Sequence, residues 1–278
     1  MKKVCVVTGG GSGMGLSAAL QMPHDRIIVV SGRTEKKLEN AVGKLKAAGF
    51  EAYAKACDTS KRENVKELAE YAAGLGEIKN VIHAAGVSPA MNVTMDEIMH
   101  INALGTVYVN QEFSALMHKG SVIVDIASMS AYTMPDNMLP KAAYPLAETD
   151  EEEFLKKALE LTGMVQDDYK KKGIAYTVSK NFVTWYAAKC AFDFGATGIR
   201  VASLSPGLIA TDMGNLEKAN GGAMLAFSCE NRMGTPEELG FAIATLADER
   251  NGYLAGFDIL CDGGTIRGMK EFRKPEKQ

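Results

Sequence analysis

The sequence lacks the features that mark nucleic-acid-binding, membrane and secreted proteins. Its 278 residues include 31 Lys or Arg and 34 Asp or Glu, so the net charge is −3, and no broad basic surface for a nucleic acid is expected. No apolar run reaches the ~18 residues of a membrane span. The apolar run after Met1 is short for a signal peptide and is followed at once by glycines. We therefore expect a cytoplasmic protein without a nucleic-acid or membrane partner.

Cysteines are few and unpaired in pattern. The five, an odd number with no Cys-x-x-Cys spacing, are Cys5, Cys57, Cys190, Cys229 and Cys261. A disulfide framework or a zinc site needs close, repeated spacings. The pattern favours free thiols in a reducing compartment and no metal site.

No linker rich in Pro, Gly or Ser interrupts the chain, and no repeat or low-complexity segment occurs. Short β-branched apolar runs, typical of strands covered on both faces, alternate with longer amphipathic stretches. The predicted strands are Val4–Val7, Ile27–Val30, Ala52–Ala56, Val81–Ile82, Val122–Ile126, Ile199–Leu204 and Phe257–Leu260. The predicted helices include Glu35–Ala48, Lys61–Leu75, Met95–Met117, Val178–Phe194 and Pro236–Leu246. This alternation predicts an α/β fold: one doubly wound (Rossmann-type) parallel sheet of about seven strands with helices on both faces.

One stretch, residues 131–172, departs from the alternation. Its first part contains Pro135, Pro140 and Pro145, and its second part has apolar residues at helical spacing. This pattern indicates a loop that leads into an inserted amphipathic helix. Thr149 with Glu152 fits a capping box at the start of that helix. We expect a single domain over residues 1–269 that carries this insert, followed by a charged tail over 270–278.

A glycine cluster follows the first predicted strand. Gly9, Gly13 and Gly15 stand where a helix begins, and a phosphate needs the backbone N–H groups there without side chains in the way. The spacing Gly-x-x-x-Gly-x-Gly predicts a nucleotide site; a plain tight turn is the alternative.

The end of the second strand indicates which nucleotide. An acid at that place holds the ribose 2′-hydroxyl of NAD, whereas an arginine suits a 2′-phosphate. The chain has Arg33 there and no acid before Glu35. We therefore favour NADP(H) over NAD(H); an ordinary solvated Arg33, with either cofactor accepted, is the alternative.

Tyr176 and Lys180 stand four residues apart and so share one helix face. A free tyrosine has a pKa of about 10, and a nearby ammonium favours its phenolate, so the pair is suited to proton transfer. Ser128 follows a predicted strand upstream. Beside a nucleotide, these residues predict a carbonyl/alcohol oxidoreductase.

Together these motifs resemble the short-chain dehydrogenase/reductases along nearly the whole chain. The resemblance implies that Ser12, Met14 and the three glycines contact the cofactor, with Asp58 and Thr59 on the adenine side. It further implies cofactor contacts from these positions: Ala84, Ala85, Gly86, Tyr176, Lys180, Pro206, Gly207, Ile209 and Thr211.

The same resemblance implies the catalytic set Asn102, Ser128, Tyr176 and Lys180. Ser128 polarises the substrate carbonyl and Tyr176 protonates the alkoxide. Lys180 lowers the pKa of the tyrosine and holds the cofactor ribose, and Asn102 positions a water.

Two departures from the family pattern stand out. His83-Ala84 occupies the place of the usual Asn-Asn, and His83 is expected to be a packed core histidine. In addition, 48 positions separate Ser128 from Tyr176, where about a dozen are usual; some bacterial hydroxysteroid dehydrogenases have insertions here.

Nearby residues compete for the same roles. Ser130 is the alternative serine, and Tyr169 is the alternative tyrosine, although its i+4 residue is Gly173. Tyr132 and Tyr144 line the substrate pocket or, as we favour, pack within the insert.

Substrate and assembly follow only from resemblance and from an apolar segment after Thr211. We expect a small carbonyl or alcohol, with a steroid, bile acid or other bulky alicyclic compound as the leading candidate. The insert rims the pocket mouth or builds a subunit interface, and a homodimer or homotetramer is expected. The alternatives are a 3-oxoacyl-[acyl-carrier-protein] reductase and, from another class, a non-catalytic dinucleotide-binding sensor or scaffold.

Overall fold

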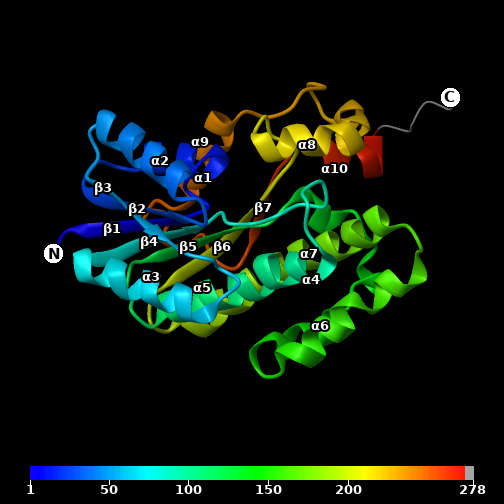
Figure 1. Ribbon diagram of the computed structural model, residues 1–278, viewed down its shortest axis with the longest axis horizontal. Helices are drawn as coiled ribbons and strands as arrows, with labels where there is room; N and C mark the ends of the chain where they lie inside the picture. Colours follow the sequence, from blue (N-terminus) through cyan, green and yellow to red (C-terminus); the bar gives the residue numbers. More distant parts are fainter. Residues whose placement is uncertain (273–278) are drawn as a thin grey trace.

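A parallel β-sheet forms the centre of the protein (Figure 1). The computed structural model describes residues 1–272, and within them the sheet has seven strands in the order β3-β2-β1-β4-β5-β6-β7. All six strand pairs are parallel, which confirms the predicted fold class. The strands are β1 (Lys3–Thr8), β2 (Arg26–Gly32), β3 (Ala52–Ala56), β4 (Glu77–His83), β5 (Val122–Ile126), β6 (Arg200–Pro206) and β7 (Asp258–Cys261).

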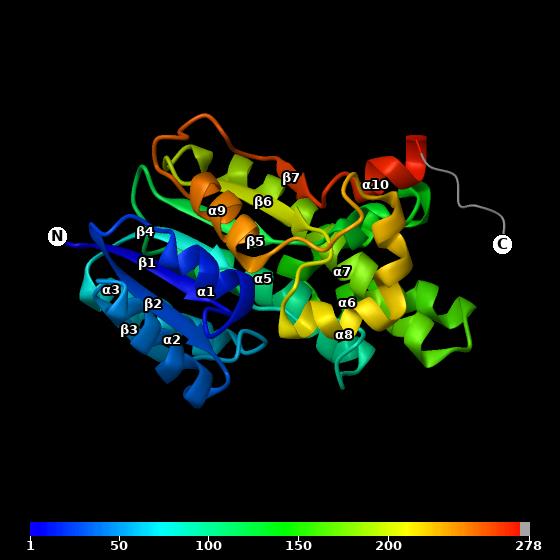
Figure 2. The ribbon, with the colours of Figure 1, turned by 90° about the horizontal axis from the view of Figure 1, so that it is seen from above.

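Helices cover both faces of this sheet (Figure 2). One face carries α1 (Gly13–Leu20), α2 (Glu35–Ala47) and α9 (Pro236–Leu246). The other carries α3 (Arg62–Leu75), α4 (Met95–Met99), the π-helical turn η1 (His100–Leu104), α5 (Gly105–Ser114) and α7 (Asp168–Gly195). Beyond the sheet lie α6 (Glu151–Leu159), α8 (Asp212–Gly221), α10 (Thr265–Arg267) and the short turns η2 (Met129–Tyr132), η3 (Asp136–Met138), η4 (Lys141–Glu148), η5 (Glu160–Met164), η6 (Gly222–Phe227) and η7 (Gly268–Phe272).

Side chains on the α3/α5/α7 face form rows across the sheet, because paired residues of parallel strands point the same way. One row is wholly apolar: Val29, Val6, Val81, Ile123 and Val201. Two residues further along each strand the row is polar: Ser31, Thr8, His83, Asp125, Ser203 and, on β7, Asp258. We call this second set the polar row. On β1, β2, β4 and β5 it lies at or next to the carboxyl end of the strand, whereas Ser203 is in the middle of β6 and Asp258 begins β7.

The strand order also determines where a ligand binds. The chain runs outward from β1 to β2 and β3, then returns to β4 on the other side of β1. The helices that follow β1 and β4 therefore lie on opposite faces, and a crevice opens between the two strand ends. The predicted glycine cluster follows β1 at this crevice.

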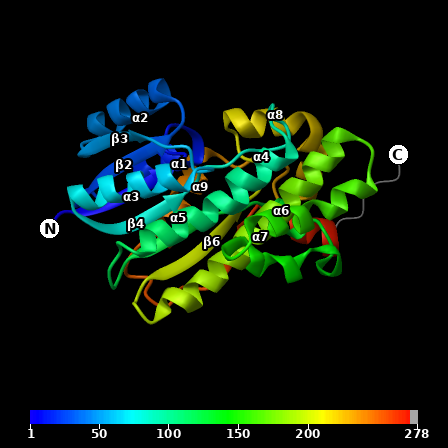
Figure 3. The ribbon, with the colours of Figure 1, turned by 60° about the horizontal axis from the view of Figure 1, so that its bottom comes forward.

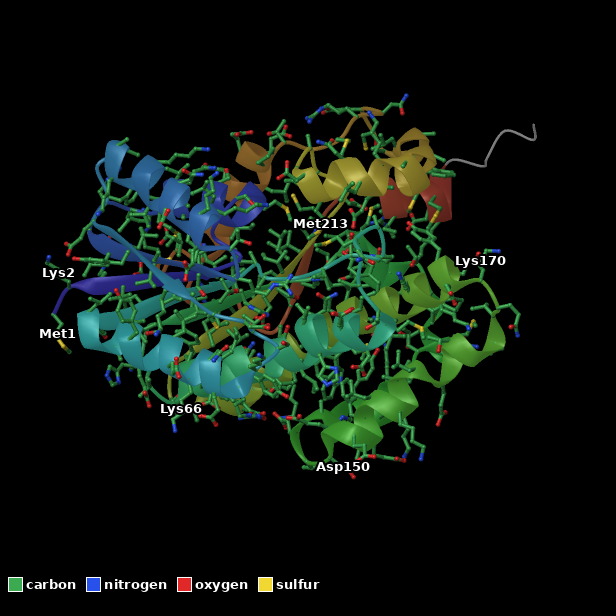
Figure 4. All side chains as sticks on the ribbon, viewed as in Figure 1. Met1, Lys2, Lys66, Asp150, Lys170 and Met213 are labelled. Atoms are coloured by element: carbon green, nitrogen blue, oxygen red, sulfur yellow. The ribbon has the colours of Figure 1, made fainter. Side chains whose placement is uncertain are left out.

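The insert packs against α7. Phe154 of α6 and Tyr144 of η4 are fully buried, and both contact the ring of Phe182, at centroid distances of 5.0 and 5.3 Å. In Figure 1, α6 lies on the side of α7 opposite to α8, and in Figure 3, where the bottom of the molecule is turned forward, α6 overlaps α7. In Figure 4, Asp150 at the start of α6 is correspondingly far from Met213 of α8.

Two local predictions on the insert were wrong. The N-cap of α6 is Asp150, whose side chain accepts a hydrogen bond from the Glu153 N–H at 3.0 Å, and Thr149 instead ends η4. Helix α7 begins at Asp168, ten residues before the predicted start at Val178, because Asp167 caps it there. The predicted helix Pro236–Leu246 is confirmed as α9, and Thr235 caps it in a capping box with Glu238. Of the predicted tail, residues 273–278 lie outside the described residues.

Candidate active site

The turn between β1 and α1 is built so that backbone comes close to backbone. Gly9 has a φ of +66°, and a Cβ there would lie 2.6 Å from the carbonyl carbon and oxygen of Ala84. A Cβ on Gly15 would lie 2.7 Å from the Gly9 oxygen. Only glycine fits at both places, so the start of α1 stays open to a phosphate group.

A cavity of about 470 Å³ extends from this turn across the ends of β1, β2 and β4. Its size and its open helix start fit a dinucleotide. It is lined by ten of the predicted cofactor residues: Gly9, Ser12, Gly13, Met14, Gly15, Arg33, Ala84, Ala85, Gly86 and Thr211.

Two cations stand at the β2 end of this cavity. Arg33 is exposed there, and Lys37 follows it in the sequence. The ammonium of Lys37 is 3.8 Å from a carboxylate oxygen of Asp212 across the mouth of the cavity. Lys37 was not predicted; it lies in the first turn of α2, whereas Arg33 precedes that helix.

Other predicted cofactor residues lie outside the lining of this cavity. Asp58 accepts hydrogen bonds from the N–H and hydroxyl of Ser60, at 3.1 and 2.8 Å, and Thr59 is buried. Gly207 and Ile209 line a separate cavity of about 330 Å³, below the loop that ends β6. Pro206, Tyr176 and Lys180 are not among the residues that line the dinucleotide cavity either.

The predicted catalytic residues come together at the ends of β4 and β5. Lys180 Nζ lies 6.0 Å from the centroid of the Tyr176 ring and donates a hydrogen bond to the Ile126 carbonyl at 2.9 Å. The Ser128 hydroxyl lies close enough to the Tyr176 phenol to lower its pKa by hydrogen bonding. A Cβ on Gly86 would lie 3.2 Å from Asn102 Oδ1 and 3.4 Å from Lys180 Nζ, so this glycine lies beside both side chains.

Asn102 is positioned by an irregular helix. It lies in the π-turn η1, where one extra residue per turn bulges the backbone, a feature common at functional sites. Its side chain accepts a hydrogen bond from the Val87 N–H at 2.9 Å and donates to the Val87 carbonyl at 3.0 Å and to Ser179 Oγ at 3.2 Å. These bonds fix the loop after β4 against α7.

Burial is the largest influence on the pKa of the tyrosine. Burial raises the pKa of Tyr176, the carboxyl of Glu217 raises it further, and only the hydrogen bond from Ser128 lowers it. The Lys180 ammonium lies 6.0 Å from the centre of the Tyr176 ring and donates a hydrogen bond to the Ile126 carbonyl. At neutral pH the phenol therefore keeps its proton and is able to donate it.

Burial also lowers the pKa of Lys180, to about 8, although Glu217 and Asp125 oppose that shift. Glu217 projects from α8, and burial raises its own pKa. Neither carboxyl was predicted. Glu217 had no sequence signal, whereas a lone acid inside an apolar strand marked Asp125 as unusual.

The alternative residues have other partners. The Ser130 N–H donates to Ser128 Oγ at 3.2 Å. Tyr132 donates to Asp258 of β7 at 2.6 Å, and the fully buried Tyr144 donates to Asn181 of α7 at 2.9 Å, so the hydrogen bonds of both tyrosines reach outside the insert. Tyr169 is 42% exposed on the surface of the insert.

His83 is a buried core residue, as expected. Its Nδ1 lies 2.7 Å from Thr8 Oγ1, and Thr8 Oγ1 accepts a hydrogen bond from the Ala85 N–H at 3.2 Å. Burial and the nearby Lys180 lower the pKa of His83 to about 3, so the ring is neutral. It helps to hold β1 against the loop after β4, beside the cavity.

Comparison with known families assigns the chain. Residues 3–143 match the family described as short chain dehydrogenase, and residues 141–265 match a family described as enoyl-(acyl carrier protein) reductase. The chain belongs to the short-chain dehydrogenase family. It is therefore an oxidoreductase acting on CH–OH groups, and its cavity binds a nicotinamide dinucleotide.

Several curated proteins are similar to the chain along almost its whole length. A short-chain dehydrogenase/reductase, bsc3, of Alternaria brassicicola is 28% identical, with 96% of this chain and 97% of that protein covered. Dehydrogenase/reductase SDR family member 4 of Sus scrofa is 26% identical, with 95% and 87% covered. A cyclohexanol dehydrogenase of an Acinetobacter strain is 24% identical, with 94% of each chain covered.

Solved structures show the same fold. A short chain dehydrogenase from Burkholderia cenocepacia in complex with NADP superposes with a TM-score of 0.76 at 20% identity, over 95% of this chain and 98% of the other. A short-chain type dehydrogenase/reductase from Mycobacterium ulcerans superposes with a TM-score of 0.75 at 22% identity, over 96% and 90%. Among residues 1–272 no helix has the length and apolar character needed to cross a bilayer.

Proposed function

We propose that this protein interconverts a ketone and a secondary alcohol with NADP(H), using Tyr176 as general acid and base. The observation that carries the proposal is the meeting of Ser128, Tyr176 and Lys180 at the strand ends beside the dinucleotide cavity. When bound, the nicotinamide supplies or accepts a hydride at the carbonyl carbon.

The side chains supply the proton chemistry of the reduction. Ser128 Oγ donates a hydrogen bond to the carbonyl oxygen, and Tyr176 donates its proton to the alkoxide that develops there. The structure supports this direction because burial keeps Tyr176 protonated. We propose that the positive charge of Lys180 stabilises the tyrosinate that remains. We propose that Asn102 positions the water that returns a proton to Tyr176.

The preference for NADP(H) rests on the cations at the end of β2. Arg33 and Lys37 both line the cavity where the adenosine ribose is expected, and the chain offers no acid at this strand end. A 2′-phosphate is well matched by two cations. A short-chain dehydrogenase of the same fold was solved in complex with NADP.

The walls beside Tyr176 favour a bulky apolar substrate. On one side Tyr176 packs in a cluster with Met91, Val93 and Met95, to which Leu159 of the insert contributes. A second cluster is built on Met129, the residue after Ser128, and includes Met224, Met233 and Met269. Methionine-rich walls adapt to irregular ligands.

From these walls we propose an alicyclic ketone or alcohol, with steroids and bile acids as the leading class. A relative named cyclohexanol dehydrogenase is consistent with a ring-bearing substrate. Because Leu159 belongs to the Tyr176 cluster, we propose that the insert closes the side of this pocket. The homo-oligomeric state stays a prediction from resemblance.

The test is a turnover screen of the purified protein with NADPH and NADH. The panel holds cyclohexanones, steroid and bile-acid ketones, sugars and a β-ketoacyl thioester. Turnover of ring ketones with NADPH is expected, and preference for the thioester would favour the acyl-carrier reductase instead. Cofactor binding without turnover on the whole panel would favour the sensor or scaffold.

A further inference from the structure

The strongest unassigned feature is a buried acid below the catalytic lysine. Asp125 has no exposed surface, and it stands in the polar row between His83 of β4 and Ser203 of β6. The row below contains Ile123, so the carboxyl lies directly on the apolar core. Burying an unpaired carboxylate at such a place costs free energy, so a nearby cation or a bound proton must neutralise its charge.

Asp125 has one close hydrogen-bonding partner in the described structure, Asn110 of α5. Asn110 Nδ2 lies 3.0 Å from each carboxyl oxygen and 3.0 Å from the Thr106 carbonyl, so its two hydrogens face three acceptors. Asn110 Oδ1 is buried and accepts no hydrogen bond within residues 1–272. A protonated Asp125 carries the O–H donor that this amide oxygen lacks. The pair is therefore suited to hold a proton.

The pair lies next to Lys180 through the backbone. The ammonium is held by the carbonyl of Ile126, the residue after Asp125, and Lys180 is itself only 6% exposed. Asp125 and Lys180 thus lie close together in a setting from which water is largely excluded. There a change of charge on one acts strongly on the other.

We infer that Asp125, paired with Asn110, is a positioning residue that keeps the Lys180 ammonium charged and thereby supports proton transfer at Tyr176. The inference rests on the proposed function. As the pH rises, the Asp125 proton leaves to solvent, and the carboxylate that remains faces the ammonium. Lys180 then keeps its charge at a pH where its burial alone would remove it.

The ionisable groups around the pair are consistent with this role. Burial raises the pKa of Asp125 to about 7 and lowers that of Lys180 to about 8, and each group opposes the shift of the other, so both titrate in a range where the charge of one acts on the other. His83 from β4 is neutral, and burial raises the pKa of the Cys190 thiol of α7, so neither adds charge at neutral pH. Glu217 also acts on Lys180, but from the substrate side on α8.

The test compares Asp125→Asn with a matched control, Asp258→Asn. The control makes the same change in the same row, where Asp258 accepts hydrogen bonds from Ser203 and Tyr132 and does not act on Lys180. The measurement is kcat/KM for ketone reduction from about pH 6 to about pH 9. We expect Asp125→Asn to shift the alkaline limb of the kcat/KM profile to a pH lower by about one unit. The variant should then lose kcat/KM roughly tenfold near pH 8 and change little near pH 6.

The inference would be overturned if the alkaline limb of the kcat/KM profile of Asp125→Asn stayed at the same pH. It would also be overturned by an equal loss of kcat/KM at every pH, because that is the result a merely structural role predicts. An equal shift in Asp258→Asn would overturn it too. Should Asp125→Asn fail to fold, infrared titration of Glu217→Gln decides, because that variant removes the other acid near Lys180. A carboxylic acid band lost near pH 7 supports the inference, and its absence refutes it.

The infrared result is independent of turnover. If the unmodified protein turns over no ketone or alcohol, the proposed function fails, while the band still reports whether Asp125 holds a proton. The two failures are therefore distinguishable.

Discussion

The dinucleotide cavity and the proton-transfer end of the same crevice are built in opposite ways. The cavity is made of glycine backbone and of exposed cations such as Arg33, which are near one another in sequence. The proton-transfer end is made of buried ionisable groups, among them Asp125 and Lys180, which come from distant segments. The first offers access to a charged ligand, and the second controls protons by excluding water.

The difference teaches where each kind of substitution acts. Exposed cations are solvated in the free protein, so losing one changes affinity for a charged ligand and leaves the fold intact. Buried groups shift one another's pKa values, so losing one changes rates and their dependence on pH. Four substitutions test this contrast.

The largest effect is expected from Tyr176→Phe, which removes the proton donor and keeps the ring. Turnover should fall by about 10²–10⁴-fold, the usual contribution of general acid–base catalysis. NADPH affinity, measured by fluorescence titration, should stay within about twofold. A rate like that of the unmodified protein would remove Tyr176 from the mechanism.

Ser128→Ala should come next, with Ser130→Ala as its matched control. Loss of one donor to a developing oxyanion costs about 10²–10³-fold in kcat. Ser130 contributes its backbone N–H to Ser128, and alanine keeps that group, so the control should lose little. Equal losses in steady-state kcat would contradict the assignment of Ser128.

Arg33→Ala should act on the cofactor and not on chemistry. A hydrogen bond to a charged group is worth about 1.5–3 kcal/mol, so NADPH affinity should fall roughly ten- to hundredfold while NADH affinity changes little. Lys37→Ala should give a smaller effect in the same direction. Lys36→Ala, an exposed cation of α2 outside the cavity lining, is the control. Equal weakening of both cofactors would reject the NADP(H) preference.

The smallest effect on activity, but a clear one on stability, is expected from His83→Asn. The folded-state pKa of His83, about 3, lies below its ordinary value of 6.5, so the unfolded chain takes up the proton first. Stability is therefore full above about pH 6.5 and is lost as the pH falls toward about 3.

The asparagine variant, which does not titrate, should show a flatter fall in urea unfolding midpoint between pH 7 and pH 4.5. His118→Asn, at an exposed histidine, is the control. A slope in His83→Asn as steep as that of the unmodified protein would show that other groups dominate the acid response.

The sequence predicted the fold and the cofactor turn because their signals are local. Strands such as Val122–Ile126 combine β-branched residues with burial on both faces, and Gly9 and Gly15 occupy places that a Cβ cannot. The start of α9 at Thr235 was also predicted, since its capping residues are consecutive.

What could not be predicted depends on segments far apart in the chain. The polar row joins residues from six strands, and only strand register shows that Asp125 lies between His83 and Ser203. Glu217 reaches Tyr176 and Lys180 because of how α8 folds over the site. The Tyr-x-x-x-Lys spacing brings Lys180 beside Tyr176, but it does not reveal that burial raises the pKa of Tyr176 or that Lys180 bonds to the Ile126 carbonyl.

The serine and the tyrosine are held by separate supports, the end of β5 and the interior of a 28-residue helix. The connection between them is therefore free to change in length without moving either. Lengthening a flexible connection fourfold costs only about 1.2 kcal/mol of closure entropy. This is the place where evolution, or an engineer, can rebuild the substrate pocket and leave the reaction centre intact.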